Sequence, residues 1–483
     1  MVEEAAGRGW PITVSGGRTG IVAGAVPEGG LVISLERMNR VLGMGRTDDG
    51  TVTVRCQAGV TLQELQTALG QGSFADSSDW DEESRRILAQ LRHEPCFFPP
   101  DPTETSASLG GVVACNASGA HSFGYGPTRN YIQGLSVVLA DGGLLQLSRG
   151  QVVAGEGGSF ARTYDDGQSR RLRPPRYRLP QTKNAAGYFS ASRLDLIDLL
   201  VGSEGTLGII AEVELRLRRQ PPFSSAAMIF LPAEAAALEL VGKLRRSRHE
   251  TGLVAVEYFD CHSLNFLREH RRQLGATSGV PECLPEVADC ALYLDLTAAA
   301  EELPRTLETV RREALSEGAD PALCWSAHEN DERERLRLFR HALPEAINQR
   351  IAAVRRRYPE VTKLGTDMAV PDDRLADMVR LYRQSLQRAG LCGLTFGHIG
   401  DNHLHVNILP ENPEEYQRGR KLYLELAREV VAMGGTPAAE HGIGKLKKDF
   451  LELLVGARGL SEMRRVKEFF DPDFRLGQGT LLE

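Results

Sequence analysis

Three glycine-rich segments lie in the first half of the chain: SGGRTG at residues 15–20, SLGGVVACNASGA at 108–120 and GSEGTLGII at 202–210. Glycine and other small residues let the backbone approach a ligand closely, because no bulky side chain stands in the way. Converging backbone N–H groups in such loops suit a pyrophosphate. One such segment is typical of an ordinary turn, but three together indicate that this half of the chain is built to bring its backbone close to a ligand.

Short strands and one helix are predicted between the glycine-rich segments. Thr61 can cap a helix that follows Gly59, and Glu64 stands three residues later, at the spacing of a capping box. A hairpin is expected over residues 135–147, with its turn at Asp141-Gly142-Gly143. Further strands are predicted at residues 12–14, 31–35 and 51–56.

The pattern of the chain changes near residue 220. Apolar residues occupy the odd positions of 209–217, from Ile209 to Leu217, and charged residues alternate with them, as a half-buried strand requires. Pro221-Pro222 then breaks the chain, so we place a domain boundary there, between residues 1–220 and 221–483. The second part alternates strands with longer amphipathic helices, which predicts an α+β domain with a mainly antiparallel sheet.

The composition excludes several classes of protein. The 483 residues suffice for two or three domains, and no stretch approaches the roughly 20 apolar residues of a membrane helix, which indicates a soluble protein. The net charge of −7 provides no basic field for nucleic acid. Eight scattered cysteines form no CxxC pair, and no secretory signal is visible, so we expect reduced thiols in the cytoplasm and no cysteine-bound iron–sulfur cluster. Segments 76–92 and 150–178 are expected to be surface insertions.

A second group of polar residues lies at 396–407, in the sequence FGHIGDNHLHVN. It predicts a strand, a tight polar turn and a returning strand, with residues 403, 405 and 407 on one face and His398 opposite them. Imidazoles and a carboxylate suit a divalent ion such as Zn²⁺ or Mn²⁺, and Glu440-His441 in AAEHGIGK supplies further candidates. The alternative is a hairpin whose polar side chains only satisfy one another.

Taken together, these segments closely resemble the PCMH-type FAD-binding domain of the flavoprotein family that contains D-lactate dehydrogenases, the glycolate oxidase FAD subunit and D-2-hydroxyglutarate dehydrogenase. The resemblance covers almost the whole chain, with the motifs in the family's order. It implies an α+β fold with a PCMH-type FAD-binding domain, followed by a cap and substrate domain. It also implies that the chain binds FAD.

By this resemblance, Ser15–Gly20 and Gly110–Gly119 would wrap the pyrophosphate and ribityl chain of FAD. Family members with covalently bound flavin carry a histidine in the first loop, where Arg18 stands here, so non-covalent FAD is implied. The implied FAD contacts around the pyrophosphate are Ser15, Gly16, Gly17, Arg18, Thr19, Gly20, Pro100, Asp101, Gly110, Gly111, Asn116, Ser118 and Gly119. Those near the adenine or flavin ring are Glu204, Gly205, Gly208 and Ile209.

The polar segments also match family motifs. GHIGDNHLH resembles the family's GHxGDGNLH, and EHGIG is unchanged, and this resemblance implies that His398, His405 and Glu440 are metal ligands and that His441 is the catalytic base. Asn407 would lie near the substrate or metal. The chain departs from the pattern at Asn402 and His403, where the family usually has Gly and Asn, and this leaves the role of His403 open.

Two cations are candidates for binding an anionic substrate. Arg340 in LFRHALPEA resembles the family's carboxylate-binding arginine, and its planar fork suits two carboxylate oxygens. An ordinary arginine on a helix surface is the alternative. Lys363 in KLGTDMAVP matches another family motif, although a lysine also commonly ends a strand or helix.

The resemblance implies FAD-dependent oxidation of a small D-2-hydroxy acid, of the lactate, glycolate or 2-hydroxyglutarate type, to the 2-oxo acid. A metal-bound hydroxyl is more acidic, so a neighbouring imidazole can take its proton while hydride passes to flavin N5. No cluster motif or nicotinamide fingerprint is visible, so electrons would pass to an external quinone, cytochrome or electron-transfer flavoprotein. We also expect a cytoplasmic location, with association at the inner face of a membrane left open, and a homodimer.

Two other functions remain open. An alkylglycerone-phosphate synthase-like enzyme uses the same fold, but its comparable motif typically has His-His-Gly, so Glu440 argues against it. A non-catalytic flavin-binding subunit of a larger oxidase is suggested by the start of the chain, because only residues 1–14 precede the first glycine-rich loop where relatives have a further βα unit. The chain is therefore expected to be shortened or to have a misassigned start, with weaker FAD binding if shortened. The intact His398, His405, Glu440 and His441 argue against such a subunit, because an inactive partner has no need for them.

Overall fold

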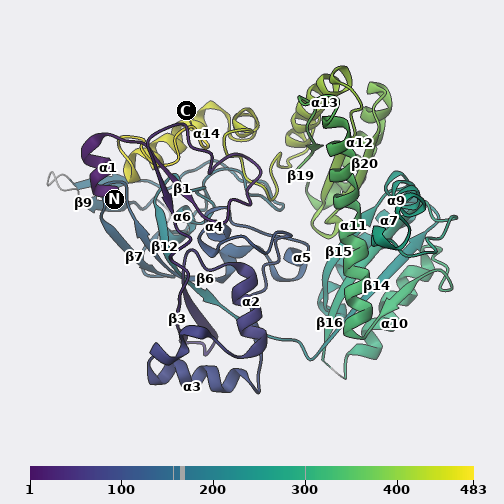
Figure 1. Ribbon diagram of the computed structural model, residues 1–483, viewed down its shortest axis with the longest axis horizontal. Helices are drawn as coiled ribbons and strands as arrows, with labels where there is room; N and C mark the ends of the chain where they lie inside the picture. The colour runs from purple at the N-terminus through teal and green to yellow at the C-terminus, as the bar shows by residue number, and fades with distance from the viewer. Residues whose placement is uncertain (156, 164–168, 300, 483) are drawn as a thin grey trace.

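The structure, a computed structural model, describes residues 1–155, 157–163, 169–299 and 301–482, and its chain forms two bodies that lie side by side (Figure 1). The elements before residue 220 are α1 (Val2–Arg8), β1 (Ile12–Ser15), β2 (Leu31–Ser34), β3 (Val41–Arg46), β4 (Val52–Gln57), α2 (Leu62–Gln71), η1 (Ala75–Asp79), α3 (Glu82–Leu91), β5 (Cys96–Phe97), α4 (Leu109–Ala114), α5 (Ser122–Tyr125), η2 (Thr128–Tyr131), β6 (Ile132–Val138), β7 (Leu144–Ser148), β8 (Val153–Ala154), β9 (Phe160–Thr163), β10 (Ser169–Leu172), β11 (Leu194–Asp195), α6 (Leu196–Leu200), β12 (Ile209–Arg216) and β13 (Arg218–Arg219).

The remaining elements form the second body, except for the last helix. They are β14 (Phe223–Leu231), α7 (Glu234–Arg246), α8 (Arg248–Thr251), β15 (Leu253–Phe259), α9 (Cys261–Leu274), η3 (Gly275–Ser278), β16 (Cys290–Ala298), α10 (Leu303–Ser316), β17 (Trp325–Ala327), α11 (Asn330–Arg355), β18 (Leu364–Gly365), β19 (Met368–Ala369), η4 (Asp372–Arg374), α12 (Leu375–Ala389), β20 (Gly393–Gly397), η5 (Ile399–Asp401), β21 (His403–Ile408), α13 (Pro413–Ala432) and α14 (Lys448–Phe470).

The main sheet of the first body is antiparallel, with the order β3-β4-β12-β6-β7 among the described residues. The predicted strand at 209–217 is its central strand, β12, and Val213 and Leu215 are fully buried, which confirms the alternation. A register shift between Ile210 and Glu212 against β6 allows Ile209 and Ile210 both to be buried. This sheet therefore owes its register to an apolar pattern visible in the sequence.

Two local signals of the first body are confirmed. The Glu64 N–H donates to the Thr61 hydroxyl at 3.2 Å and the Thr61 N–H donates to the Glu64 carboxylate at 2.8 Å, so α2 begins with the predicted capping box. The predicted hairpin is the β6–β7 pair, with its turn at Asp141–Gly143. Of the predicted insertions, residues 76–92 form much of η1 and α3, whereas part of 150–178, at 156 and 164–168, lies outside the described residues.

The second body is built on an antiparallel sheet that runs β17-β14-β16-β15-β20-β21-β18 in the described chain, with β19 also paired to β21. Side chains of β14 alternate between two cores: Met228 and Phe230 pack with α9 and α11, whereas Ile229 and Leu231 pack with α7 and α10. The sheet is therefore covered by helices on both faces. The predicted α+β domain with a mainly antiparallel sheet is confirmed.

The end of the chain returns to the first body. Figure 1 shows α14, in yellow, beside the purple α1 and β1, and Leu451, Met463 and Leu476 are buried in the same core as the first body's sheet. The Lys467 ammonium is buried there and donates to the Thr206 and Leu476 carbonyls, each at 2.7 Å. The division at residue 220 stays a prediction, and the packing adds that the last part of the chain helps to complete the first core.

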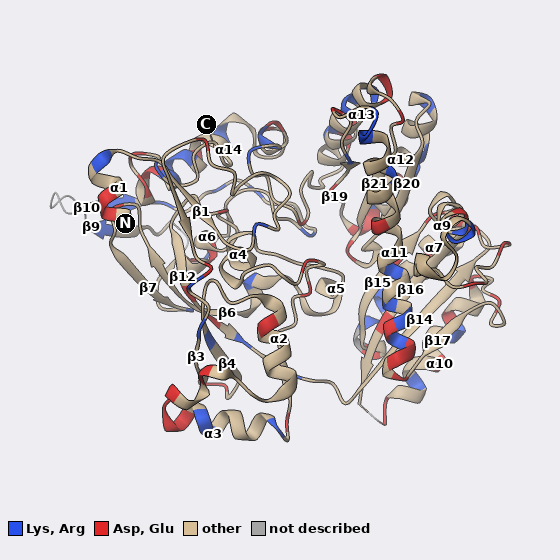
Figure 2. Ribbon diagram, viewed as in Figure 1, with Lys and Arg blue, Asp and Glu red and all other residues tan. Residues whose placement is uncertain are grey.

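The charged residues and the cysteines are arranged as the composition predicted. Lys and Arg are mixed with Asp and Glu along α3 and α11 (Figure 2). All eight cysteines are free thiols. Among the described residues, no helix is long and apolar enough to cross a membrane.

Candidate functional site

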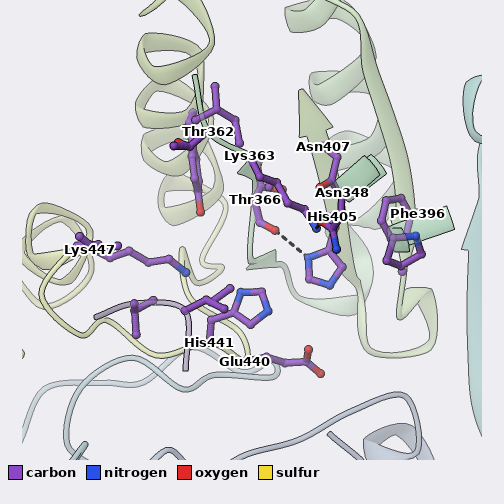
Figure 3. Close-up of a pocket in the computed structure, with 18 of the residues that line it drawn as sticks. Asn348, Thr362, Lys363, Thr366, Phe396, His405, Asn407, Glu440, His441 and Lys447 are labelled. Atoms are coloured by element: carbon purple, nitrogen blue, oxygen red, sulfur yellow. Dashed lines mark hydrogen bonds between the residues drawn. The ribbon is translucent and has the colours of Figure 1, made fainter. Parts of the chain in front are cut away.

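A cavity of about 1270 Å³ gathers most of the polar residues singled out in the sequence. Figure 3 shows His405, Asn407 and Lys363 on one side, with Glu440, His441 and Lys447 from the segment that returns to the first body on the other. The site is thus assembled from several stretches that are distant in sequence. Its polar lining includes Arg340, Asn348, Lys363, Thr366, His398, His405, Asn407, Glu440, His441 and Lys447.

Three histidines and one glutamate could hold a metal ion. His398 directly follows β20, His403 and His405 lie in β21, and Glu440 belongs to the returning segment. One ligand atom from each of the four residues lies within 4.8 Å of the others. The Glu440 Oε2 is 3.4 Å from His398 Nε2 and 3.8 Å from His403 Nδ1. Borderline nitrogen donors and one carboxylate fit a divalent transition metal.

Neighbouring groups hold the imidazoles in place. His398 Nδ1 lies 2.6 Å from the Glu257 carboxylate, and His405 Nδ1 lies 2.8 Å from the Thr366 carbonyl, a contact drawn in Figure 3. Metal-binding histidines usually make such a contact through the nitrogen that does not face the metal. The predicted ligands His398, His405 and Glu440 are therefore brought together in a geometry that fits a metal.

Asp367, which is fully buried, organises the EHGIG segment. Its carboxylate accepts hydrogen bonds from the backbone N–H groups of Glu440 and His441, each at 3.0 Å, and from the Lys447 ammonium at 2.8 Å. His441 Nδ1 lies 3.4 Å from the same carboxylate. The His441 ring stacks on that of His405, with centroids 5.7 Å apart. His441 is thus oriented beside the histidine cluster.

The electrostatics distinguish these histidines. Burial lowers the pKa of His441 and outweighs the opposing effect of Asp367, so its imidazole is neutral and can accept a proton. Burial also lowers the pKa of His403 to about 4. Burial opposes ionisation of His398, but Glu257 and Glu440 raise its pKa to about 10. Burial alone would raise the pKa of Glu440, yet His398 and Lys183 lower it well below the usual value.

The three predicted substrate-binding residues lie in the same cavity. Arg340 is mostly buried, and its Nε lies 3.5 Å from the Glu257 carboxylate that also holds His398. The alternative of an ordinary surface arginine does not fit this burial. The Lys363 ammonium donates to the Asn348 side chain at 3.1 Å, and the Asn407 Oδ1 is buried without a hydrogen-bond partner among the described residues.

The first two glycine-rich loops pack against each other. The Gly17 N–H donates to the Ser108 hydroxyl at 3.2 Å, and a methyl group added at Gly16 would lie 2.2 Å from that hydroxyl oxygen. A methyl group at Gly119 would lie 2.0 Å from the Asp101 carbonyl. These glycines are therefore required by contacts within the protein. At Gly20 an added methyl group would meet no protein atom within 4 Å, which leaves room beside the first loop.

Several other predicted FAD contacts have partners within the protein. Arg18 is paired with Glu36, and the Asn116 side chain accepts from the Arg129 N–H at 2.9 Å. Asn116 and Ser118 also line a second cavity of about 490 Å³, which extends to Lys183, Asp401 and Ala439 near the histidine cluster. A cofactor in that cavity would reach toward the cluster, and the individual FAD contacts stay predictions. The other predicted contacts are Ser15, Thr19, Pro100, Gly110, Gly111 and Gly205.

The third glycine-rich segment contacts the EHGIG segment and the sheet. The Glu204 carboxylate accepts from the backbone N–H groups of Ile443 at 2.9 Å and Gly444 at 2.7 Å. Burial raises the pKa of Glu204 to about 7, opposed by these two N–H groups. A methyl group at Gly208 would lie 2.4 Å from a Val137 methyl carbon, and Ile209 pairs with Val138 in the sheet.

The sequence reasoning missed Glu257, Asp367 and Lys183. Glu257 carried a signal, because it is the lone carboxylate in LVAVEYF, a strand that is otherwise apolar and fully buried. No sequence signal of comparable strength pointed to Asp367. Lys183 lies in a loop without regular structure, yet its ammonium contacts Glu440 and donates to the Gly119 carbonyl at 2.9 Å.

The departure at Asn402 leaves the turn intact. Asn402 has φ 54°, a left-handed conformation that asparagine tolerates better than most residues other than glycine. Its side chain donates to Asp372 at 2.6 Å and accepts from Arg245. The turn that joins His398 to His403 therefore keeps its shape without a glycine.

Comparison with known families identifies the chain. The model of the FAD-linked oxidases, C-terminal domain, matches residues 220–481, and an FAD-binding domain model matches residues 1–80 and 85–148. The chain belongs to the FAD-linked oxidases. This FAD-linked oxidase therefore carries an FAD-binding domain, as the resemblance of its glycine-rich segments implied.

Curated relatives match along nearly all of this FAD-linked oxidase. It is 27% identical to the glycolate oxidase subunit GlcD of Bacillus subtilis over 475 residues, with 98% of this chain and 83% of that protein covered. It is 29% identical to a D-lactate dehydrogenase of Anaerostipes hadrus and 28% identical to a D-2-hydroxyglutarate dehydrogenase of Xanthomonas citri pv. viticola; each match covers 98% of this chain and 84% of the relative.

Solved structures share the fold. The 4-ethylphenol oxidase of Gulosibacter chungangensis superposes with a TM-score of 0.64 at 18% identity, and p-cresol methylhydroxylase with 0.65 at 15%. Each covers 100% of this chain and 86% of the other. The PCMH-type fold of this FAD-linked oxidase is thus confirmed.

Proposed function

We propose that the protein oxidises a D-2-hydroxy acid to the 2-oxo acid, with FAD as electron acceptor and a divalent metal, Zn²⁺ or Mn²⁺, beside the substrate. One observation carries this proposal: an oriented imidazole at His441 stacks against His405 of a three-histidine, one-glutamate cluster in the same cavity as Arg340. The names of the relatives support the substrate class.

His441 is the proton acceptor of the proposed reaction. Asp367 holds Nδ1, so the N–H tautomer at Nδ1 leaves Nε2 as the basic nitrogen. The depressed pKa of His441, caused by burial, keeps this nitrogen unprotonated at neutral pH. His441 thus removes the proton of the substrate hydroxyl as the alcohol carbon is oxidised.

Arg340 binds the substrate carboxylate in this proposal. Its guanidinium is mostly buried in the cavity wall and fixed on one side by Glu257, so its planar donors present a rigid site for a carboxylate. Lys363 and Asn407 add an ammonium and an unpartnered amide oxygen to the same cavity. These residues orient the hydroxyl carbon and neutralise the acid.

The cofactors supply the remaining chemistry. FAD, when bound, takes up hydride at N5, and a divalent ion makes the neighbouring hydroxyl more acidic. His398, His405 and Glu440 would hold the ion, and the loops at 15–20 and 110–119 would hold FAD without a covalent bond. We assign re-oxidation to an external quinone, cytochrome or electron-transfer flavoprotein. We also propose that the protein is a homodimer. Its proposed location is the cytoplasm, with the inner face of a membrane as the alternative.

The test is flavin reduction without oxygen. The purified holoenzyme would be mixed with D- and L-lactate, glycolate, and D- and L-2-hydroxyglutarate, with and without Zn²⁺ or Mn²⁺, while the flavin absorbance is followed. One D-acid is expected to bleach the flavin in wild type and fail to do so in His441→Ala. As a matched control, the exposed His93→Ala should bleach at the wild-type rate. A bound flavin that no acid in the panel reduces would contradict the proposal.

A second candidate is a non-catalytic flavin-binding subunit of a larger oxidase, because one relative is named as an oxidase subunit. The half-buried and oriented His441 favours catalysis, since a partner without activity has no need of it. Flavin that stays oxidised in the isolated chain, but is reduced after a partner protein is added, would favour the subunit. The alkylglycerone-phosphate synthase-like alternative predicts no net flavin reduction.

A further inference from the structure

His403 stands where the family motif usually has asparagine, and it is fully buried. It occupies the middle of the cluster: its ring centroid lies 4.4 Å from that of His405 and 5.3 Å from that of His398. Its Nδ1 is 3.8 Å from the Glu440 Oε2, the oxygen that also approaches His398. A side chain at this position faces the same point as the predicted ligands.

The three imidazoles share one arrangement. Each has one ring nitrogen against an oxygen outside the cluster: His398 against Glu257 at 2.6 Å, His405 against the Thr366 carbonyl at 2.8 Å, and His403 Nε2 against Asp367 at 3.1 Å. In each ring the other nitrogen is left for the centre of the cluster. Metal-binding histidines show this division between an outer anchor and an inner ligand atom.

A core histidine that only satisfies its neighbours is the competing explanation. It does not account for the ring nitrogens, because both are buried without a hydrogen-bond partner among the described residues. Nε2 still lies 3.1 Å from the Asp367 carboxylate, whereas Nδ1 lies 3.8 Å from the Glu440 Oε2. Leaving a buried polar nitrogen unpaired destabilises the folded protein. A cation at the centre of the cluster would remove this cost, because Nδ1 would then donate its lone pair to the ion.

We propose that His403 is a metal ligand through Nδ1, so that the ion is held by three imidazoles and one carboxylate. This inference rests on the metal site of the proposed function and extends it by a ligand that the family motif does not supply. Four protein ligands would complete a tetrahedral shell. A substrate that also binds the ion would raise the coordination number to five or six, which favours Mn²⁺ over Zn²⁺ as the metal of the proposed function.

The test uses Co²⁺ alone, whose visible absorption reports ligand type and coordination number. Chelator-treated full-length wild type, His403→Asn, His403→Ala and His405→Asn would be titrated with Co²⁺, and affinity and spectrum recorded. Far-ultraviolet circular dichroism and the flavin content would show that each variant is folded. The exposed His93→Asn is the matched control, which should bind as wild type does.

We expect both His403 variants to bind Co²⁺ at least about 10-fold more weakly than wild type and to give a changed visible spectrum. His405→Asn, which removes a predicted ligand, should show the same two effects. Two variants of different size separate loss of the ligand from a packing defect. Unchanged affinity and spectrum in folded His403→Asn, alongside weakened His405→Asn, would overturn the inference. Flavin reduction by a D-acid would then still support the proposed function. No Co²⁺ binding by wild type would also overturn the inference.

Discussion

The protein uses buried or half-buried histidines in two opposite ways. At His403 and His405 of the metal cluster and at the neighbouring His441, burial lowers the pKa of each imidazole and leaves it neutral. At the boundary between the bodies, His121 lies between Asp101 at 3.2 Å and Asp295 at 3.1 Å. Burial opposes ionisation there too, but the two carboxylates raise the pKa of His121 to about 9.

The difference lies in the neighbours. His121 meets two carboxylates, one from each body, and becomes a charged bridge between them. The clustered imidazoles face one another as well as carboxylates, and a second positive charge within the cluster would be repelled. A bridge needs a permanent charge, whereas a base needs a free lone pair. His398 is the exception in the metal cluster, because Glu257 and Glu440 raise its pKa to about 10, and binding of an ion would release its proton. The predictions below test this contrast, beginning with the largest expected effect.

Removal of the proposed base, His441, should strongly slow substrate oxidation and leave the His121 bridge unchanged. We expect His441→Ala to slow anaerobic flavin reduction by about 10²- to 10⁴-fold, the usual contribution of a positioned base. Stopped-flow absorbance with the best D-acid measures this rate. A reduction rate within a few-fold of wild type would show that another group takes the proton.

Asp367 holds the segment of Glu440 and His441 in place beside the metal cluster, as Asp101 and Asp295 hold His121 at the bridge. Asp367→Asn removes the charge that pairs with buried Lys447 and part of the acceptor for two backbone N–H groups. Breaking a buried ion pair from one side costs about 3–5 kcal/mol, so we expect a loss of that size in the free energy of unfolding. Denaturant unfolding measures it. The exposed Asp449→Asn should change the stability little, and an equally small effect in Asp367→Asn would contradict this role.

Arg340 lies near carboxylates of both the metal cluster and the His121 bridge. Glu257 of the first, and Asp101 and Asp295 of the second, all raise the pKa of Arg340 against the effect of burial. Arg340→Lys keeps the charge but loses the planar fork. We expect kcat/KM for the D-acid to fall about 10- to 100-fold, an estimate based on the loss of one charge-assisted hydrogen bond. Steady-state kinetics with an artificial electron acceptor measures this change. An unaltered kcat/KM would mean that the carboxylate binds elsewhere.

The bridge predicts a pH dependence of stability. The folded pKa of His121, about 9, lies above the ordinary value of 6.5, so its stabilisation is complete below pH 6.5 and is lost as the pH rises through 9. Its side chain is 31% exposed, so we expect a contribution of only about 1–2 kcal/mol. Thermal unfolding of His121→Asn and wild type between pH 6 and 10 should converge at the alkaline end. A constant difference between them would rule out the charged bridge.

Local patterns predicted much of the fold and the candidate site. The alternation in β12, the capping box of α2 and the β20–β21 hairpin depend on neighbours in sequence, so the sequence alone predicted them. The motif residues His398, His405, Glu440 and His441 were also placed together. The rest depends on packing between distant segments. Asp367 acts through residues more than 70 positions away, and Gly16 is small because Ser108 lies against it.

The return of the chain's end to the first body has a consequence for biosynthesis. The first core contains residues from Ala5 to Leu482, so it cannot close while the ribosome still holds the last part of the chain. The apolar side chains of the first body that pack against α14 therefore lack this cover until the second body has been made and α14 emerges. A nascent chain stalled before α14 should therefore stay associated with chaperones, even though its second sheet is complete.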